Sequence, residues 1–382
     1  MGNKVLLGLS GGVDSAVSAY LLKKQGYEVT GCFMRNWDSI ANNDISGNPT
    51  LNGNKCTQEF DYDDAVKTAS ELGIEILRKD FIEEYWKDVF SMFIETYKKG
   101  FTPDPDVFCN KYIKFGYFLE YAKSLGFETI AMGHYAQRID EDGESHLYKA
   151  FDRNKDQSYF LGQISSYQLS HALFPLALIT KPEVRKIAEE LNLSVSHKKD
   201  STGVCFIGER NFKDFLSNYL PSKPGVVVDI VTMKEIEKHD GILYYTVGQH
   251  KGLNIGGIKG RSTAPFFVVG KNVEKNILYV AQEEGNNYRL SYRCLLDSFN
   301  WIGSDKPAIN DKIECNCKFR YRGVDKAVTL TLLEDTKTAF LDYPGYPYVA
   351  KGQIACLYLG DRLIGSGIIE KTYDKNNQEI SY

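Results

Sequence analysis

Runs of apolar residues alternate with segments of helical periodicity over the first ~165 residues. The apolar runs predict strands at residues 4–9, 28–34, 74–78 and 128–132. Apolar positions spaced three and four apart predict helices at residues 14–25, 62–72, 81–99 and 110–125. Such alternation predicts a parallel, doubly wound sheet with ligands at the carboxyl ends of its strands.

The pattern changes further along the chain. Thr180-Lys-Pro-Glu183 has the form of a capping box, which predicts a helix to residue 191, and residues 212–219 predict another short helix. The stretch YLPSKPGVVVD, starting at Tyr219, then brings two prolines and a glycine before a β-branched run, as is typical of a domain boundary. Beyond it, short runs between turn residues predict strands. These runs are residues 226–231, 243–247, 266–269, 277–280, 312–321, 327–333, 338–343, 354–359 and 363–369.

These patterns predict three domains in an α/β protein. Residues 1–218 form the domain with the doubly wound parallel sheet, residues 219–288 a small β-rich central domain, and residues 289–382 a C-terminal β-barrel. A chain of 382 residues with 43% hydrophobic content is long enough for these three cores. Residues 36–59, rich in Asn, Gly, Ser and Asp, predict a long loop within the first domain.

Composition limits the cellular location and the kinds of ligand that we expect. No apolar run approaches the ~18 residues of a membrane span, and no signal region precedes the first strand, so we expect a cytoplasmic protein with no membrane partner. The net charge of −4 means that any nucleic-acid partner must be met by basic residues gathered locally. Eight cysteines are too sparse for a disulfide framework, and they form no C-x-x-C pair. We therefore expect no protein-bound metal.

The stretch GLSGGVDSAV, which starts at Gly8, follows the first predicted strand and opens the first predicted helix. Paired glycines let backbone N–H groups surround an anion, and the helix N-terminus adds partial positive charge. Ser10 and Ser15 can donate hydroxyl hydrogen bonds, and Asp14 can hold Mg²⁺ or cap the helix. The loop lacks the lysine with which a Walker loop reaches a transferred γ-phosphate. The alternative is a tight turn with no ligand.

The order S-G-G-x-D-S resembles the signature of the ATP pyrophosphatases, or PP-loop enzymes. The resemblance implies a PP-loop nucleotide-binding domain that grips the pyrophosphate of ATP and transfers AMP to an oxygen of its substrate. Residues 8–15 would then bind ATP. They are Gly8, Leu9, Ser10, Gly11, Gly12, Val13, Asp14 and Ser15.

Cys109 lies in the stretch TPDPDVFCNKYIKF, where two prolines precede a predicted helix. A helix N-terminus lowers the pKa of a thiol, and Lys111 and Lys114 would act in the same direction. Asp104 and Asp106 would oppose them. The alternative is a buried cysteine that serves as a small apolar side chain.

Cys205 lies in the stretch KKDSTGVCFIGER, after a polar turn. Lys198, Lys199 and Arg210 flank it, although Phe206 and Ile207 beside it also fit a core cysteine. Local sequence leaves both interpretations open.

Together the two cysteine stretches resemble the tRNA-specific 2-thiouridylases, and the resemblance extends over nearly the whole chain. Other stretches that carry it are Met132-Gly-His-Tyr135, Lys155-Asp-Gln-Ser-Tyr-Phe160, Tyr245-Thr-Val-Gly248 and Phe319-Arg-Tyr-Arg322. The resemblance implies ATP-dependent adenylation of O2 of the wobble uridine in the tRNAs for Lys, Glu and Gln. Sulfur then comes from a cysteine persulfide, which yields 2-thiouridine, AMP and pyrophosphate.

The same resemblance implies a role for each matching residue. Cys205 would carry the persulfide, Cys109 would be its partner in a transient disulfide, and Asp106 would be the acid/base. Met34 and Gly133 would join residues 8–15 in binding ATP with Mg²⁺. The implied tRNA contacts are Asp104, Pro105, Asp106, His134, Lys155, Asp156, Gln157, Arg320, Tyr321 and Gln353. The sulfur donor would be a cysteine desulfurase or a sulfur-relay protein.

Some features leave other interpretations open. Asp104 stands where that family has asparagine, which puts a carboxylate beside the target base. Arg320-Tyr321-Arg322 offers two cations around an aromatic ring for RNA, but on its own it also fits an ordinary surface strand. An amide-forming PP-loop synthetase would not need the two cysteines, and a non-catalytic tRNA-binding protein would release no pyrophosphate.

Overall fold

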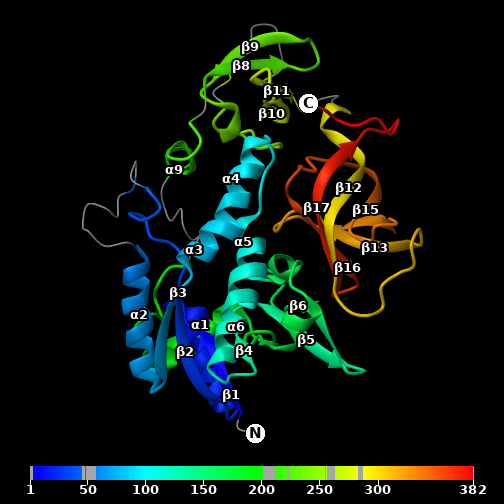
Figure 1. The fold of residues 1–382 in the computed structure, drawn as a ribbon. Helices are drawn as coiled ribbons and strands as arrows, with labels where there is room; N and C mark the ends of the chain where they lie inside the picture. The colour runs from blue at the N-terminus through cyan, green and yellow to red at the C-terminus, as the bar shows by residue number, and fades with distance from the viewer. Residues whose placement is uncertain are drawn as a thin grey trace.

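The computed structural model describes residues 3–44, 48, 57–200, 211–221, 223–253, 255, 263–282 and 287–381. Cys205 lies outside these residues, as does part of the predicted loop at 36–59. Figure 1 shows the parallel sheet with its helices at one end of the molecule, the central domain at the other end, and the C-terminal barrel alongside. Among the described residues, no helix has both the length and the apolar character needed to cross a membrane.

The N-terminal sheet has five parallel strands in the order β3-β2-β1-β4-β7, which confirms the doubly wound prediction. These strands are β1 Lys4–Gly8, β2 Glu28–Arg35, β3 Glu75–Asp80, β4 Ile130–Ala131 and β7 Ala172–Leu173. β1 lies between β2 and β4, so the strand order reverses there. This reversal places the expected ligand site at the carboxyl ends of β1 and β4.

Apart from α7, which was not predicted, the helices of the first domain lie close to the predicted positions. They are α1 Val13–Lys24, α2 Thr57–Leu72, α3 Ile82–Tyr85, η2 Trp86–Phe90, α4 Ser91–Lys98, α5 Pro105–Phe108, η3 Cys109–Tyr117, α6 Phe118–Ser124, α7 Ser166–Ser170, α8 Lys181–Glu190 and α9 Phe212–Ser217. The capping box at Thr180 and Glu183 is confirmed, with both reciprocal bonds present. The helix expected from residue 110 starts earlier, at Pro105, because a proline has the backbone angle of a first helical residue.

The central domain contains a four-stranded sheet in the order β10-β11-β8-β9. The strands are β8 Gly225–Asp229, β9 Lys234–His239, β10 Phe266–Asn272 and β11 Ile277–Gln282. The strand predicted at 243–247 is wrong, since a 3-10 turn, η5 Ile242–Tyr244, occupies its start. The turn lets the adjacent side chains of Ile242 and Leu243 pack against the same core, whereas a strand would send them to opposite faces.

The C-terminal strands close into a barrel in the order β12-β15-β14-β13-β16-β17, with β12 paired to β17. They are β12 Leu290–Trp301, β13 Lys312–Lys318, β14 Lys326–Leu332, β15 Ala339–Pro347, β16 Ile354–Leu359 and β17 Arg362–Tyr373. Alternate residues fill the interior, as in β14, where Val328, Leu330 and Leu332 are buried. The strand predicted to continue to residue 321 ends at Lys318, where the chain turns toward β14.

A hairpin from the N-terminal part of the chain joins the barrel. Its strands are β5 Ala136–Glu141 and β6 Glu144–Lys149, and β6 pairs with β17 at Leu147↔Leu363 and Tyr148↔Arg362. Figure 1 shows the hairpin between the parallel sheet and the barrel. The first domain therefore adds two strands to the sheet of the barrel, so backbone pairing as well as side-chain contact joins the two domains, while the parallel sheet remains separate.

We expect Leu330→Ala to destabilise the barrel, because Leu330 is fully buried in its interior. The cost should be about 2–5 kcal/mol of unfolding free energy, from lost burial and the cavity that remains. Chemical denaturation followed by tryptophan fluorescence measures the change. Val324→Ala is the matched control, since Val324 is 68% exposed before β14 and should change stability by less than about 0.5 kcal/mol. Equal effects of the two variants would contradict the assigned barrel interior.

Candidate functional site

The loop at residues 8–15 connects β1 to α1 at the predicted ligand edge of the sheet. Gly11 has φ +73°, and a Cβ there would lie 2.1 Å from the Asp61 carbonyl oxygen, so only glycine fits. The Ser15 hydroxyl donates to the Gly12 carbonyl at 2.9 Å and accepts from the Ser10 N–H at 3.2 Å. The loop therefore has a fixed shape around the start of α1, whose first N–H groups lack intrahelical acceptors. That arrangement suits an anion.

Two of the residues predicted to complete the nucleotide site lie against this loop. A Cβ on Gly8 would come within 3.0 Å of the Met34 side chain. A Cβ on Gly133 would come within 3.2 Å of the Ser15 nitrogen, so the glycine lets the chain after β4 approach the start of α1. The structure thus brings together residues 8–15, Met34 and Gly133. Their binding of ATP stays a prediction.

A network of charges surrounds Asp14. Its Oδ1 accepts from the Tyr135 hydroxyl at 2.8 Å and from Lys181 Nζ at 2.7 Å. Lys181 also pairs with Asp200 at 2.9 Å, and Asp200 pairs with Lys155 at 2.8 Å and with Arg185. Burial alone would raise the pKa of Asp200, but the bonds from Lys155 and Lys181 outweigh it and hold that pKa below its ordinary value. The network links the loop to Lys155, a predicted tRNA contact.

A second cation holds the loop from the other side. Lys198 Nζ donates to the Gly11 carbonyl at 3.0 Å and pairs with Asp61 at 2.7 Å and Asp64 at 2.6 Å on α2. Sequence reasoning missed Lys181, Tyr135 and Asp200 as members of this site. No local motif marks them, because Tyr135 and Lys181 lie 121 and 167 residues from Asp14.

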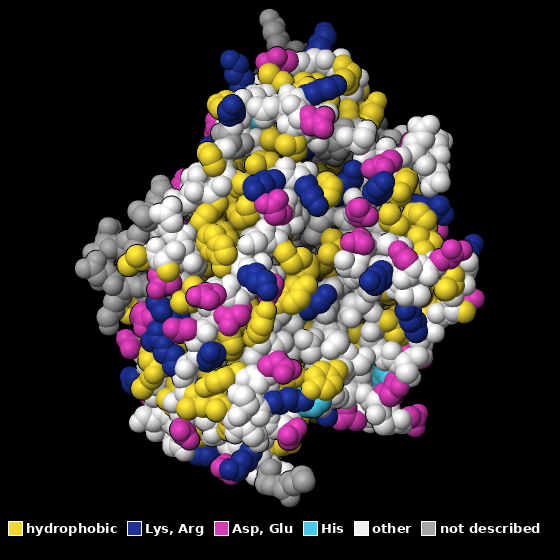
Figure 2. Space-filling view, in the orientation of Figure 1, with side chains coloured by type: hydrophobic (Ala, Val, Ile, Leu, Met, Phe, Trp, Pro, Cys, Tyr) yellow, Lys and Arg dark blue, Asp and Glu magenta, His cyan; other side chains and the backbone are white. Residues whose placement is uncertain are grey.

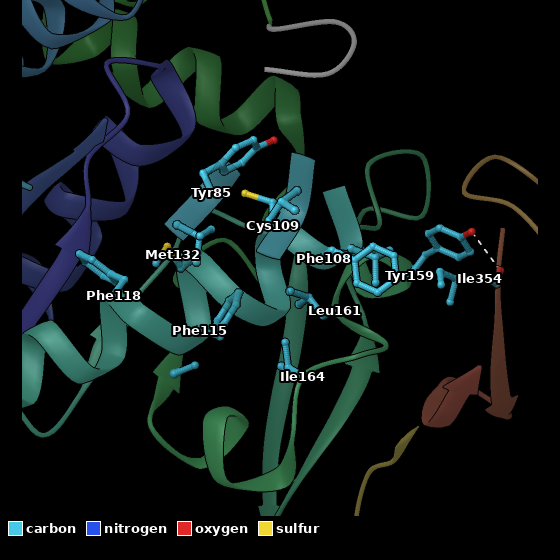
Figure 3. Close-up of a cluster of buried hydrophobic side chains, with 14 of the residues drawn as sticks. Tyr85, Phe108, Cys109, Phe115, Phe118, Met132, Tyr159, Leu161, Ile164 and Ile354 are labelled. Atoms are coloured by element: carbon cyan, nitrogen blue, oxygen red, sulfur yellow. Dashed lines mark hydrogen bonds between the residues drawn. The ribbon is translucent and has the colours of Figure 1, made fainter. Parts of the chain in front are cut away.

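Cys109 lies one turn into the helix that starts at Pro105, and it is 2% exposed. It belongs to the largest apolar cluster among the described residues, together with Tyr85, Phe108 and Met132. Figure 3 shows Cys109 among these side chains. Cys109 therefore has the predicted buried, apolar surroundings. It also lies near a helix start as predicted, but the helix begins one turn earlier, at Pro105.

Asp104 and Asp106 lie at the beginning of the same helix. Asp104 is 8% exposed, and its burial, followed by the neighbouring charge of Asp106, raises its pKa to about 7. Burial also raises the pKa of Asp106, and the charge of Lys114 opposes that shift. Two carboxyl groups this close, in surroundings this apolar, do not both ionise readily near neutral pH. Asp104 can therefore donate a hydrogen bond where a carboxylate could not.

His134 connects the cysteine helix to the nucleotide loop. It follows Gly133, and its ring lies 5.8 Å from that of Phe115 on η3 and 6.3 Å from that of Phe174. Burial, with the charge of Lys114, lowers its pKa well below the ordinary value, so the ring is neutral. Its buried Nδ1 has no hydrogen-bond partner among the described residues. A neutral ring with an unused nitrogen suits a contact with an incoming base.

In the loop at residues 155–157, predicted to contact tRNA, one of the three side chains is buried. Asp156 is 5% exposed and accepts from the Ala150 N–H at 3.0 Å and from Lys318 of the barrel at 3.3 Å. Gln157 Oε1 accepts from the Tyr135 N–H at 3.0 Å. Lys155 and Gln157 are partly exposed. Asp156 thus joins the first domain to the barrel, and Gln157 joins this loop to the chain after His134.

The predicted tRNA contacts of the barrel lie in two places. Arg320 and Arg322 are exposed in the turn after β13, and each forms no ion pair within the described ranges. The alternative of an ordinary surface strand is wrong, since β13 ends at Lys318 and these residues form a turn, in which the Tyr321 ring packs 4.2 Å from that of Phe160. Gln353 is elsewhere: its Nε2 donates to the carbonyls of Thr102 and Pro103, at 3.2 Å each.

The electrostatic surface matches the small net charge. On the face shown in Figure 2, Lys and Arg side chains are interspersed with Asp and Glu. In the part of the chain that the structure describes, no group of three or more His, Cys, Asp or Glu side chains is placed to hold a metal ion.

Comparison with known proteins identifies relatives over nearly the full chain. Family models described as tRNA methyl transferase HUP domain, tRNA methyl transferase PRC-barrel domain and aminomethyltransferase beta-barrel domain match residues 3–209, 213–282 and 291–369. The tRNA-specific 2-thiouridylase MnmA of Mycoplasma capricolum subsp. capricolum is 50% identical, with 97% of this chain and 99% of the relative covered. The protein of that name from Metamycoplasma arthritidis is also 50% identical, covering 99% of both chains.

One solved structure similar to part of the chain is a 4-thiouridine synthetase–RNA complex with bound ATP. The likeness has a TM-score of 0.32 at 14% identity and covers 55% of this chain and 46% of that one.

Lys181→Met should destabilise the protein and change its response to acid. Because Lys181 helps depress the pKa of Asp200, the stability from Asp200 is present above its unfolded pKa of about 3.9 and is lost as pH falls below that value. The variant should lose about 1–3 kcal/mol at pH 7 and show a shallower acid decline. Denaturant titrations from pH 7 to pH 2.5 measure both. Lys186→Met, on the exposed face of the same helix, is the control and should keep the wild-type profile.

Asp104→Asn should stabilise the protein at alkaline pH. The raised pKa means that stability is complete below the unfolded pKa of about 3.9 and is lost as pH rises through the folded value of about 7. An amide removes this loss, so the variant should gain about 2–4 kcal/mol relative to wild type at pH 8.5 and little at pH 4. Asp142→Asn, in the exposed turn of the β5–β6 hairpin, serves as control. Parallel pH profiles for wild type and Asp104→Asn would contradict a perturbed Asp104.

Proposed function

Because the chain belongs to the tRNA-specific 2-thiouridylase family, we propose that it is the enzyme that replaces O2 of the wobble uridine of tRNA with sulfur, using ATP. The observation that carries this proposal is one juxtaposition: residues 133–134 touch the loop at 8–15 on one side and the helix of Cys109 on the other. The loop suited to phosphate and the helix that carries Cys109 thus lie on either side of residues 133–134. The relatives' names supply the substrate, tRNA uridine.

The first step proposed is adenylation. The N–H groups at the start of α1 and the hydroxyls of Ser10 and Ser15 would hold the pyrophosphate of ATP, with Met34 and Gly133 around the adenosine. Uracil O2 attacks the α-phosphorus, the α–β phosphoanhydride bond breaks, and pyrophosphate leaves. The carbonyl oxygen, a poor leaving group, becomes part of AMP. Binding geometry and fixed N–H dipoles supply the stabilisation that a Walker lysine supplies elsewhere.

Magnesium would accompany the triphosphate. One carboxylate plus phosphate oxygens is a usual Mg²⁺ environment, and Asp14 is the carboxylate of the loop, so the residues fit the ion. Bound there, Mg²⁺ supplies charge neutralisation for the departing pyrophosphate. Lys181 and Tyr135 hold Asp14 through Oδ1 at this position.

The second step proposed is sulfur transfer. A persulfide on Cys205 attacks C2, and the C2–O bond breaks as AMP leaves. The thiolate of Cys109 then attacks the inner sulfur, so the S–S bond to the transferred sulfur breaks and a Cys109–Cys205 disulfide forms. Cytoplasmic thiols reduce that disulfide, and a cysteine desulfurase or relay protein reloads Cys205. Asp106 would act as the acid/base toward the target base. Neutral Asp104 would donate a hydrogen bond to that base.

The tRNA would lie across the first domain and the barrel. Asp104, Pro105 and His134 are proposed to surround the target base, and Lys155 with Arg320 to meet the backbone. Tyr321 is proposed to stack beside it, and Gln353 to contact the RNA from the barrel. Buried Asp156, and Gln157 through its bond to Tyr135, would act by keeping this surface in shape.

A thiolation assay tests the proposal. Unmodified tRNA-Lys transcript is incubated with the protein, ATP, Mg²⁺, a cysteine desulfurase and cysteine, then digested and analysed for 2-thiouridine by mass. We expect Cys109→Ser and Cys205→Ser to lose thiouridine by at least about a hundredfold while adenylation of the tRNA, measured as pyrophosphate release, continues. Asp14→Asn should lose both. Cys315→Ser, a buried cysteine on β13, is the matched control.

Each outcome has a meaning. Full thiolation by Cys205→Ser would exclude the persulfide role. Pyrophosphate and AMP without thiouridine in the wild type would support the nucleotide loop but contradict the sulfur acceptor or donor. Thiolation by Asp14→Asn at the wild-type rate would contradict the role of the loop.

A further inference from the structure

A cavity of about 340 Å³ lies where the three domains meet, away from the nucleotide loop. The end of α4 forms one wall, β10 and its turn the second, and the start of β12 with residues 348–351 the third. Figure 1 shows α4 reaching the central domain, with the C-terminus of the chain beside it. A Cβ on Gly100 would lie 2.5 Å from Val273, so the helix end and the central domain are in close contact.

Two lysines from different domains line this cavity. Lys271 comes from β10 and Lys351 from the loop before β16, and Lys99 adds a third positive charge. Glu274 is the one acidic residue among the lining residues. Thr102 and Ser291 also belong to the lining, although the Ser291 hydroxyl is bonded to that of Tyr343 at 2.9 Å. The lining of the cavity thus carries an excess of positive charge.

The charge of Lys271 has no acidic counterpart. Its Nζ donates to the Tyr245 carbonyl at 2.9 Å, and it forms no ion pair with any described residue. Burial lowers its pKa to about 7, which measures how poorly the ammonium is solvated there. An ammonium has three hydrogens to donate, so one carbonyl leaves most of its capacity unused.

Lys351 is only partly neutralised. Its Nζ donates to the Ile380 carbonyl at 2.7 Å, while Glu379 lies 3.9 Å away and pairs more closely with Lys371, at 3.3 Å. Burial lowers the pKa of Lys351 as well. One carboxylate is therefore shared between two lysines at this end of the cavity, and positive charge remains in excess.

We propose that this junction cavity binds a phosphoryl group, held between the ammonium groups of Lys271 and Lys351. Two cations match the charge of a phosphate ester, and a volume near 300 Å³ is at the lower end of the range for ligand pockets. An anion would recover the solvation that both lysines lose on burial. The group is either free phosphate or its esters, or a backbone phosphate of the bound tRNA.

The ligand would also act on the neighbouring site. The Thr102 N–H donates to the Lys351 carbonyl at 2.8 Å, and Gln353 holds the carbonyls of Thr102 and Pro103. Thr102 belongs to the cavity wall and precedes Asp104 by two residues. A phosphoryl group on Lys351 would therefore stiffen the segment that leads into the cysteine helix.

The first arm of the test uses inorganic phosphate alone. Isothermal titration calorimetry of the full chain should show binding, weakened about tenfold or more in Lys271→Met and in Lys351→Met. Lys238→Met, on exposed β9, should bind as wild type. Lys271→Arg should retain binding, which separates loss of charge from loss of fold, and thermal unfolding of each variant without phosphate checks the fold directly.

The second arm uses tRNA, and it alone rests on the proposed function. Filter binding over a range of salt concentrations should give Lys271→Met a salt slope smaller by about one if a backbone phosphate occupies the cavity. Weakened phosphate binding with an unchanged tRNA slope assigns a free anion. A reduced tRNA slope without phosphate binding assigns the tRNA backbone. Phosphate affinity within twofold of wild type in both folded Met variants, together with an unchanged slope, overturns the proposal, whatever the thiolation assay gives.

Discussion

The pairing of β6 with β17 is the contact on which the rest of the arrangement depends. The hairpin leaves the parallel sheet directly after the residues that touch the nucleotide loop, and its second strand adds to the barrel. Because backbone hydrogen bonds fix register, the barrel cannot slide relative to the loop without breaking them. The barrel therefore delivers Gln353 and Lys318 to fixed points on the first domain.

That constraint explains why so many polar residues of this protein are buried between domains. Asp156 and Gln163 are at most 5% exposed, and their partners include Lys318 and Ser366 of the barrel. Buried polar groups are tolerated when each finds a partner, and such networks favour one arrangement of domains over others. The proposed site, which would align a nucleotide, a base and a cysteine, would benefit from a single arrangement of domains.

The sequence predicted the parts of this protein that local pattern determines. The nucleotide loop was found because its glycines and serines are contiguous, and the doubly wound sheet because each apolar strand is followed by a periodic helix. Strand β9 and the β5–β6 hairpin escaped notice because their residues are largely polar or exposed, and tertiary pairing determines them. The partners of Asp14 were not predicted for a different reason. They lie more than a hundred residues away in the sequence, and contacts at that separation produce no local sequence pattern.

Gln353 illustrates a consequence of tight domain contact. Both hydrogens of one amide nitrogen are directed at the carbonyls of residues 102 and 103. If the same amide is to donate hydrogen bonds to an RNA, its bonds to residues 102 and 103 must break as the new bonds form. Such an exchange adds little to affinity, since bonds gained and lost nearly cancel. The exchange would instead release residues 102–103 from Gln353. Binding of the RNA at the barrel would therefore increase the conformational freedom of the chain that leads into Asp104.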